Sequence, residues 1–226
     1  MMKWDTRVRH NLFTVYTDFN QPTWHYHSTM IVIVFIACTA GFCYFLYHLI
    51  VSGLFKCNIE VNEEKVPKLR IAYKNYVGEY KTAGQRFGSL MNAIKAKKNF
   101  DPDSYLGIYF DDPAKVKPIE CRFTVAVVLE DDGAENPLKE DGYKESNIKV
   151  TSALHATFPF YGMISILLAI FRVYPALTNA ALTKSVKGTV MLELSHQSKH
   201  LTDYYYPFGE NSEQFYSLIN DLKKSN

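Results

Sequence analysis

An uncharged apolar stretch near the N-terminus constrains this chain more than any other feature of its sequence. It runs from Met30 to Ile50 and contains 21 residues, of which 11 are Ile, Val, Leu or Phe. As an α-helix it would be about 32 Å long, which matches a hydrocarbon core of about 30 Å. The large apolar side chains together favour insertion by roughly 3 to 7 kcal/mol. We therefore predict a transmembrane helix over residues 29–55, preceded by a short luminal, extracytosolic N-terminus over residues 1–28.

A cleaved signal peptide is the alternative, with Cys38 and Ala40 as the small residues before the cleavage site. The apolar run begins some 29 residues into the chain and continues past that site, which does not fit a short signal sequence. Basic residues lie closer to its C-terminal end, at Lys56, Lys65, Lys68 and Arg70, than to its N-terminal end. This charge distribution favours a cytosolic location for residues 56–226.

The composition of the remaining chain is that of a folded domain. The 226 residues are 47% hydrophobic and carry a net charge of +2, which gives no reason to expect direct nucleic-acid binding. The four cysteines show no CxxC spacing and no disulfide framework, so they indicate a reducing compartment.

Two successive rounds of the same element order follow the apolar segment. Alternating Leu69, Ile71 and Tyr73 predict a strand, and Phe87 to Ile94 carry the spacing of one helix face. Two strands come next, at residues 104–110 and 121–129. The second round has a strand at 148–154, a helix at 160–173, strands at 189–196 and 201–208, and a closing helix at 213–224. Two strand–helix–strand–strand units predict an α+β domain built by duplication, with helices on one face of antiparallel sheets.

The segment at residues 160–171 is apolar enough to suggest a second membrane span. Pro159 and Gly162 shorten any helix there, and twelve helical residues reach only about 18 Å. We predict that it is the most buried helix of the domain.

Asp111 and Asp112 stand together before Pro113 at the end of a predicted strand. Successive side chains of an extended chain point to opposite faces, so the two carboxylates should not meet at one substrate. Asp before Pro is typical of a turn. A turn is therefore favoured over an acid/base pair or a metal site.

Histidines and other reactive side chains give no further catalytic pattern. His25 and His27 lack additional metal ligands nearby, and His196 and His200 flank a predicted hairpin turn, where we expect them to be exposed. We predict no catalytic residues, no metal, no cofactor and no enzymatic activity, although a hydrolase is a third and weaker hypothesis.

Four stretches carry a resemblance to a known family: "IAYKNYVGEY" (71–80), "YFDDPAKVKPIECR" (109–122), "ATFPFYGMISILLAIFRVYPAL" (156–177) and "LEL" (192–194). The chain resembles the GyrI-like domains, the bacterial effector-binding superfamily, over about residues 55–222, and in particular its animal members with an N-terminal membrane anchor. The resemblance implies a single-pass protein of the endoplasmic reticulum or nuclear envelope with a cytosolic domain. It also implies a receptor or adaptor role in selective autophagy of the reticulum, or in recruiting the valosin-containing AAA ATPase to protein–DNA crosslinks.

In those animal members, an aromatic-x-x-aliphatic motif in an acidic tail pairs with GABARAP-type autophagy modifiers by strand addition. The candidates here are Phe215 with Leu218 and Tyr216 with Ile219. The alternative is that Phe215, Leu218, Ile219 and Leu222 form the core stripe of a helix, which cannot add as a strand.

A ligand-facing group is the other candidate site. Glu193 and Met191 share one face of their strand, and Tyr105 and Tyr109 share one face of another. If the aliphatic faces meet the helices, these four residues line the free face of the sheet. Glu193 matches the acidic last-strand position that binds cationic drugs in bacterial family members, which implies a membrane-tethered protein that binds an organic cation or amphiphile. The alternative is a solvent-facing glutamate.

Overall fold

The structure is a computed structural model, and it describes residues 24–130 and 135–224. The predicted N-terminus over residues 1–28, with the side chains of His25 and His27, therefore lies largely outside the described residues. The chain divides into two compact units between His48 and Leu49. The described residues of the first unit all belong to helix α2 (Trp24–Val51), in which residues 28–51 are long and apolar enough to cross a membrane. Its side chains are not buried against protein, so α2 is a candidate membrane anchor.

The second unit is built around six antiparallel strands that close into a barrel in the order β1-β3-β2-β5-β6-β4. The strands are β1 (Asn62–Val77), β2 (Ser104–Tyr109), β3 (Arg122–Val128), β4 (Lys144–Pro159), β5 (Met191–His196) and β6 (Leu201–Pro207). Closure depends on the two long strands β1 and β4, which pair with each other from Asn62–His155 to Tyr73–Lys144. The predicted antiparallel sheets with helices on one face are therefore a single closed barrel.

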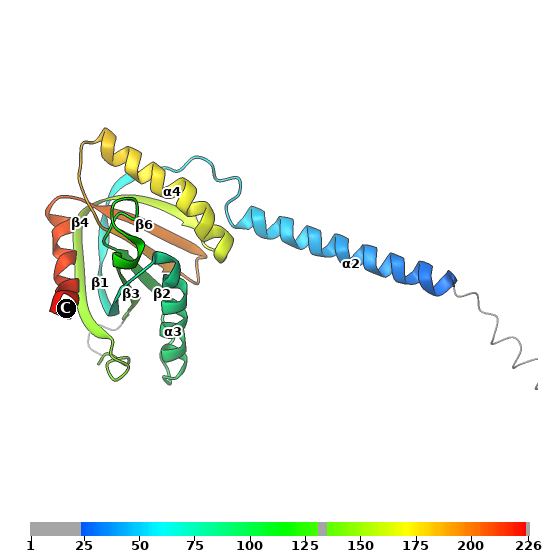
Figure 1. Cartoon of the computed structure of the whole chain (residues 1–226), viewed down its shortest axis with the longest axis horizontal. Coiled ribbons are helices and arrows are strands. Elements are labelled where there is room, and N and C mark those ends of the chain that lie inside the picture. Colours follow the sequence, from blue (N-terminus) through cyan, green and yellow to red (C-terminus); the bar gives the residue numbers. More distant parts are fainter. Residues whose placement is uncertain (1–23, 131–134, 225–226) are drawn as a thin grey trace, which may run out of the picture. The chain divides into compact units, whose positions relative to one another are not determined.

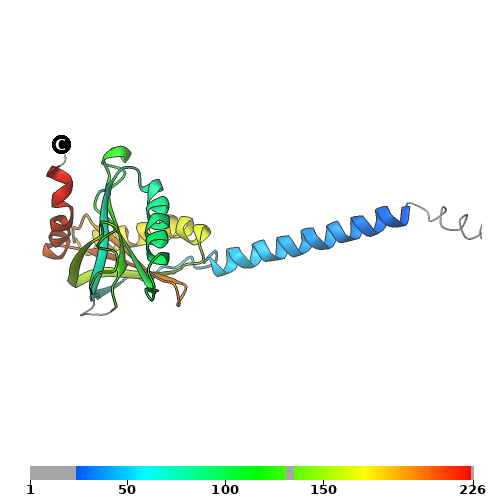
Figure 2. The ribbon, with the colours of Figure 1, turned by 90° about the horizontal axis from the view of Figure 1, so that it is seen from below.

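Three α-helices and three 3-10 helices complete the described part of this unit (Figure 1). They are η1 (Tyr80–Thr82), α3 (Ala83–Lys95), η2 (Pro118–Glu120), α4 (Met163–Thr183), α5 (Glu210–Glu213) and η3 (Gln214–Lys224). Figures 1 and 2 show α3 and α4 on one side of the strands and the C-terminal α5–η3 segment on the other.

The alternating strand pattern divides the apolar side chains among three clusters. Ile71 and Tyr73 of β1 point into the barrel, where Phe215 of η3 also packs, whereas Ala72 between them contacts the cluster beneath α3. The third cluster lies beneath α4 and includes Val173 and Leu177. The barrel therefore has an interior closed by the C-terminal segment, and two outer faces covered by the helices.

Helix α4 differs from its predicted form in length and in burial. It continues through Pro175 to Thr183, although the residue before a proline disfavours the helical conformation. The buried residues recur every fourth position, at Ser165, Ala169, Val173, Leu177 and Ala181, so packing on the barrel outweighs the local cost. Helix α4 has five buried residues against three in α3, but only this stripe faces the barrel, and large apolar side chains on the opposite face are exposed.

Candidate ligand-binding site

The pairing of β2 with β5 places the four predicted ligand-facing residues on one face of two adjacent strands. Tyr109 lies opposite Met191, Gly107 lies opposite Glu193, and Tyr105 lies opposite Ser195. The aliphatic side chains between them, which include Leu106 and Leu192, point into the barrel interior. The alternation of side chains in the sequence therefore predicts correctly which residues of β2 and β5 point into the barrel and which point outward.

This face is nevertheless covered, which corrects the expectation that it would be free. The aliphatic faces meet the barrel interior and the C-terminal segment rather than α3 and α4. Met191 packs in the cluster beneath α4, and Tyr105 packs beside the cluster beneath α3. The physical reason is barrel closure. A closed barrel has its own interior, and the aliphatic side chains of β2 and β5 pack there instead of against the helices.

Glu193 is enclosed by phenol side chains from three elements. The Tyr174 hydroxyl of α4 donates a hydrogen bond to Oε1 of Glu193, and the Tyr109 hydroxyl of β2 also bonds to this carboxylate. Tyr204 of β6 is the residue directly opposite Glu193 on the other neighbouring strand. The Tyr174 and Tyr204 rings meet edge to face with centroids 6.1 Å apart. The glutamate is thus partly buried among these rings, and no cationic side chain is paired with it in the described structure.

Burial raises the pKa of Glu193, and the hydrogen bonds from Tyr174 and Tyr109 offset part of that rise. Burial followed by the nearby Glu193 charge raises the pKa of Tyr109, of Tyr174 and of Tyr204. The phenols therefore stay neutral and can only donate to the carboxylate. The site is a single acidic group in an aromatic, poorly solvated surrounding.

Gly107 provides the space in which the Tyr109 ring lies. A Cβ atom at position 107 would be 3.1 Å from Cε2 of Tyr109 and 3.3 Å from its hydroxyl oxygen. The other side of the Tyr109 ring meets Tyr80, whose ring centroid is 5.0 Å away in an edge contact. The Tyr80 hydroxyl in turn donates to the Asp111 carbonyl oxygen at 2.8 Å. This chain of contacts fixes Tyr109 beside Glu193.

Sequence reasoning found Tyr109 and Glu193 but missed Tyr174 and Tyr204. A possible signal for Tyr204 was the "DYYYP" run on the strand that follows β5. Tyr174 gave no such signal, because the rotation of α4 about its axis decides whether this residue meets the sheet.

The Asp111–Asp112 pair is a turn, as predicted, and its two carboxylates diverge. Asp111 forms a two-point ion pair with Arg122, with Nε 2.9 Å from Oδ2 and Nη2 2.6 Å from Oδ1. Asp112 accepts a bond from the Ala114 backbone N–H at 2.9 Å and pairs with exposed Lys115. The pair anchors the strand end and offers no shared site for a substrate or metal.

A polar row that the sequence did not suggest closes one end of the barrel. Asp203 joins two histidines, with Nε2 of His155 at 3.0 Å and Nε2 of His196 at 3.1 Å. His196 also contacts the Ser104 hydroxyl at 2.8 Å, and His155 contacts Glu64 at 3.0 Å. The expectation that His196 is exposed is wrong, because cross-strand pairing brings it against β2 and β6; His200 is exposed in the turn.

The candidate modifier-binding residues lie in η3. Phe215, Leu218 and Ile219 are buried in the barrel cluster, and Tyr216 packs against that cluster. The second of the two interpretations from the sequence therefore holds for these residues: Phe215, Leu218 and Ile219 form a buried stripe of the core. To pair with another protein as a strand, it would first have to leave the barrel.

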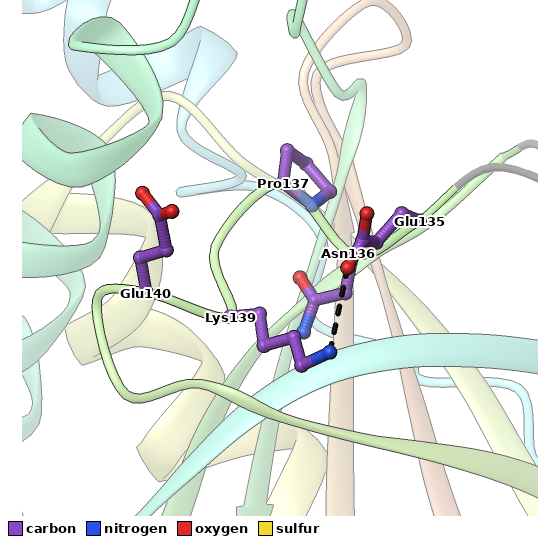
Figure 3. A pocket seen from close by; sticks show the side chains of 5 residues that line it. All are labelled: Glu135, Asn136, Pro137, Lys139 and Glu140. Carbon is purple, nitrogen blue, oxygen red and sulfur yellow. Dashed lines mark hydrogen bonds and ion pairs between the residues drawn. The ribbon is translucent and has the colours of Figure 1, made fainter.

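Two hollows of about 400 Å³ lie away from Glu193. One is bordered by Glu135, Asn136, Pro137, Lys139 and Glu140, and Figure 3 shows that Glu140 lies apart from the Lys139–Glu135 pair. Asn136 is structural here, because its amide donates to the Tyr143 carbonyl oxygen and accepts from the Leu138 N–H. The other lies between α3 and β1 and includes Arg86 and Tyr143.

Among residues 24–130 and 135–224, no group of three or more His, Cys, Asp or Glu side chains is placed to hold a metal ion. All four cysteines are free thiols, with Cys121 buried and the other three exposed.

The fold and the site define an antiparallel barrel domain with one acidic side chain among three tyrosines. The model of the GyrI-like family, described as a GyrI-like small molecule binding domain, matches residues 59–186. This match covers more than half of the chain, and the chain therefore belongs to the GyrI-like family.

Two curated relatives resemble the chain in alignments of 180 positions that cover 72% of it. They are the testis-expressed protein 264 homolog of Mus musculus, 28% identical, and testis-expressed protein 264 of Homo sapiens, 30% identical. The matches cover 56% and 55% of those proteins, so the chain spans about half the length of the relatives it matches. The crystal structure of the EcmrR C-terminal domain is similar with a TM-score of 0.47 and 11% identity, over 67% of this chain and 98% of that one. The family match and the two curated relatives confirm the predicted resemblance to the GyrI-like family.

Proposed function

We propose that this chain is a membrane-anchored protein that binds a small organic cation or cationic amphiphile at Glu193. The observation that supports this most directly is the carboxylate enclosed by Tyr109, Tyr174 and Tyr204 without a cationic side chain paired to it. A buried carboxylate costs several kcal/mol unless it is paired or protonated. A cation that enters the site relieves this cost and gains cation–π contacts worth about 0.5 to 2 kcal/mol each.

Tyr174 is the group that must give way when the cation binds. The Tyr174 hydroxyl donates a hydrogen bond to Oε1 of Glu193. Tyr174 belongs to α4 and not to a strand of the barrel. Tyr109 is held more firmly, between Gly107 and Tyr80. We infer that the cation displaces the Tyr174 ring and then lies between α4 and the β2–β5 face.

The membrane part of the proposal assigns α2 as a single-pass anchor, with residues 56–226 on the cytosolic side of the endoplasmic-reticulum membrane. Its support is the apolar length of residues 28–51, the basic residues that follow them and the four free thiols. Protease protection of the full chain in sealed microsomes tests this assignment. Cleavage of the domain in intact microsomes is expected, and its protection would contradict the cytosolic location.

Binding is tested on the full chain in lipid nanodiscs with tetraphenylphosphonium as the probe. Glu193→Gln should weaken binding at least tenfold at neutral pH, because it removes the charge but keeps the shape and the hydrogen-bond acceptor. Tyr174→Phe is the matched control, since it removes only the competing hydroxyl and should leave binding unchanged or tighter. Equal binding by the wild type and Glu193→Gln, or equal binding of neutral triphenylphosphine oxide, would overturn the proposal.

A second candidate function is a receptor or adaptor in autophagy of the reticulum, or in AAA-ATPase-linked repair. It is supported by the similarity to testis-expressed protein 264 over 72% of the chain together with the candidate anchor. Retention of GABARAP-type modifiers or of the valosin-containing AAA ATPase on the full chain in nanodiscs would support it. Modifier binding through the Phe215–Ile219 segment must be lost in Tyr216→Ala or Leu218→Ala while circular dichroism stays unchanged. If neither partner is retained, this second candidate fails and the cation proposal is unaffected.

A further inference from the structure

The outer face of α4 is apolar and uncovered within the compact unit Leu49–Asn226. Five large side chains stand exposed there at spacings of three and four residues: Met163, Ile166, Leu167, Ile170 and Phe171. Met163 is 69% exposed and Phe171 is 76% exposed. Since soluble domains rarely leave such a contiguous apolar face in water, something covers it.

The segment that leaves the candidate anchor is fixed to this same helix. The Arg172 guanidinium of α4 donates to the carbonyl oxygens of Gly53 at 2.6 Å, Leu54 at 2.8 Å and Lys56 at 3.2 Å. All of these residues belong to the unit that begins at Leu49. Phe55, which stands among the three bonded residues, is itself 73% exposed.

These contacts restrict how far α4 can be from a membrane that α2 crosses. Helix α2 ends at Val51, two residues before Gly53, so the two Cα atoms are at most about 8 Å apart. The end of the anchor is therefore held near α4 by covalent connection and by the Arg172 bonds. No length of free linker separates the domain from the end of the apolar segment.

The composition of α4 suits a lipid surface. Between Met163 and Thr183 the helix contains no Asp, Glu or Lys, and its one charged residue, Arg172, is occupied by backbone carbonyls. Its buried stripe packs on the barrel, so the helix cannot itself cross the bilayer without leaving the domain. A helix that is apolar on its exposed face and fixed at the membrane surface lies in the interface plane.

We propose that the outer face of α4, together with Phe55, inserts into the headgroup and upper acyl region of the same bilayer that α2 crosses. This inference rests on the proposed membrane anchoring. The GyrI-like domain then rests on the membrane through α4, and the helix that carries Tyr174 is also the helix that contacts lipid.

The test uses the full chain in vesicles of phosphatidylcholine and phosphatidylserine, with bimane attached to single cysteines. Cys38 alone reports on α2, Leu167→Cys reports on the outer face of α4, and Ser89→Cys on exposed α3 is the matched control. The other native cysteines are replaced by Ala, and circular dichroism checks the fold. Lipids spin-labelled just below the headgroup should quench the Leu167 probe at least twofold more than the Ser89 probe. Lipids labelled deep in the acyl chain should quench the Cys38 probe.

Equal quenching at Leu167 and Ser89, with Cys38 quenched, would overturn the docking of α4 and leave the anchor intact. An unquenched Cys38 would overturn the anchor and the docking together. Shielding of Leu167 from aqueous iodide that persists in detergent and rises with protein concentration would place a second copy on α4. That outcome would also overturn the proposal.

Discussion

Tyr174 and Glu193 join the outer helix α4 to strand β5 through a phenol-to-carboxylate hydrogen bond. In the sequence, the rest of α4 and a loop lie between Tyr174 and β5, which begins at Met191. A change in the charge of Glu193, or a cation bound to it as proposed, would act directly on this contact between α4 and β5.

Glu193→Gln should change the pH dependence of stability as well as binding. Burial raises the folded-state pKa of Glu193 above its ordinary value of 4.5, so between the two pKa values the folded protein holds a proton that the unfolded chain has released. This contribution is fully present below the unfolded pKa and is lost as pH rises through the folded pKa. The free energy of unfolding, measured with urea from pH 4 to 8, should therefore fall less with rising pH for Glu193→Gln than for the wild type. Parallel curves would contradict the raised pKa.

Tyr174→Phe should raise the pKa of Glu193 further, because the hydrogen bond from Tyr174 lowers it. The lost bond to a carboxylate should cost about 1 to 3 kcal/mol of stability at a pH where Glu193 is ionised. Infrared titration of the carboxyl band, with Glu193→Gln to assign it, measures the pKa. A lower pKa in Tyr174→Phe would show that another group satisfies the carboxylate.

Gly107→Ala should disturb the site through Tyr109. Its new Cβ would stand 3.1 Å from the Tyr109 ring, which is closer than ordinary contact, so the ring must move away from its place near Glu193. Overpacking of this kind costs about 1 to 3 kcal/mol. Gly84→Ala in α3 is the control, because nothing lies within 4 Å of its new Cβ, and it should be neutral or stabilising by up to about 1 kcal/mol. Equal effects of the two substitutions in urea unfolding would refute the steric argument.

The adjacent aspartates provide a matched pair. Asp111→Asn should destabilise by about 3 kcal/mol, because it breaks the ion pair with Arg122 and leaves that charge poorly compensated. Asp112→Asn should cost no more than about 1 kcal/mol, since its pair with Lys115 is exposed. The side chain of Asp111 is 8% exposed and that of Asp112 is 46% exposed. Thermal unfolding measures the stability of both variants. A larger loss of stability in Asp112→Asn than in Asp111→Asn would contradict this account.

The polar row at the barrel end predicts a second pH effect. Burial acts to lower the pKa of His155, but the hydrogen bond and charge of Asp203 and the charge of Glu64 outweigh it and raise the pKa above 6.5. Burial acts to raise the pKa of Asp203, but bonds and charge from His155 and His196 lower it below 3.8. The His155 contribution is lost as pH rises through its folded pKa, and the Asp203 contribution is lost as pH falls through its folded pKa.

Stability should therefore be lower at pH 8 than at pH 6, and His155→Gln should reduce this difference. The Glu193 effect has the same sign, so the experiment is best done in the Glu193→Gln background, where only the His155 part remains. An unchanged pH 6 to 8 difference in the double variant would show that His155 does not titrate in this range.

The sequence predicted the faces of the strands well because side-chain alternation is a local property. The pairing of Gly107 with Glu193 and of Tyr109 with Met191 follows from that alternation once β2 and β5 are neighbours. The closure of the barrel could not be predicted, since it depends on pairing between β1 and β4, which are far apart in the chain. Evolutionary duplication of the two halves stays a prediction.

Helix α4 shows where local rules were insufficient. The predicted helix ended at residue 173, but the buried stripe continues past Pro175 to Leu177 and Ala181 on the barrel. The same packing turned Tyr174 toward Glu193 and left Phe171 exposed. Helix rotation and the surface available for packing are tertiary properties, so neither Tyr174 nor the outer apolar face could be assigned from the pattern alone.

The central claim is that a cation pairs with the ionised carboxylate of Glu193. Its most direct test is calorimetric titration of tetraphenylphosphonium into the full chain in nanodiscs, at a series of pH values from 4.5 to 8. The account predicts that affinity rises with pH as Glu193 loses its proton, and that Glu193→Gln binds weakly with no such rise. The same pH profile in both proteins would contradict the claim and place the cation elsewhere.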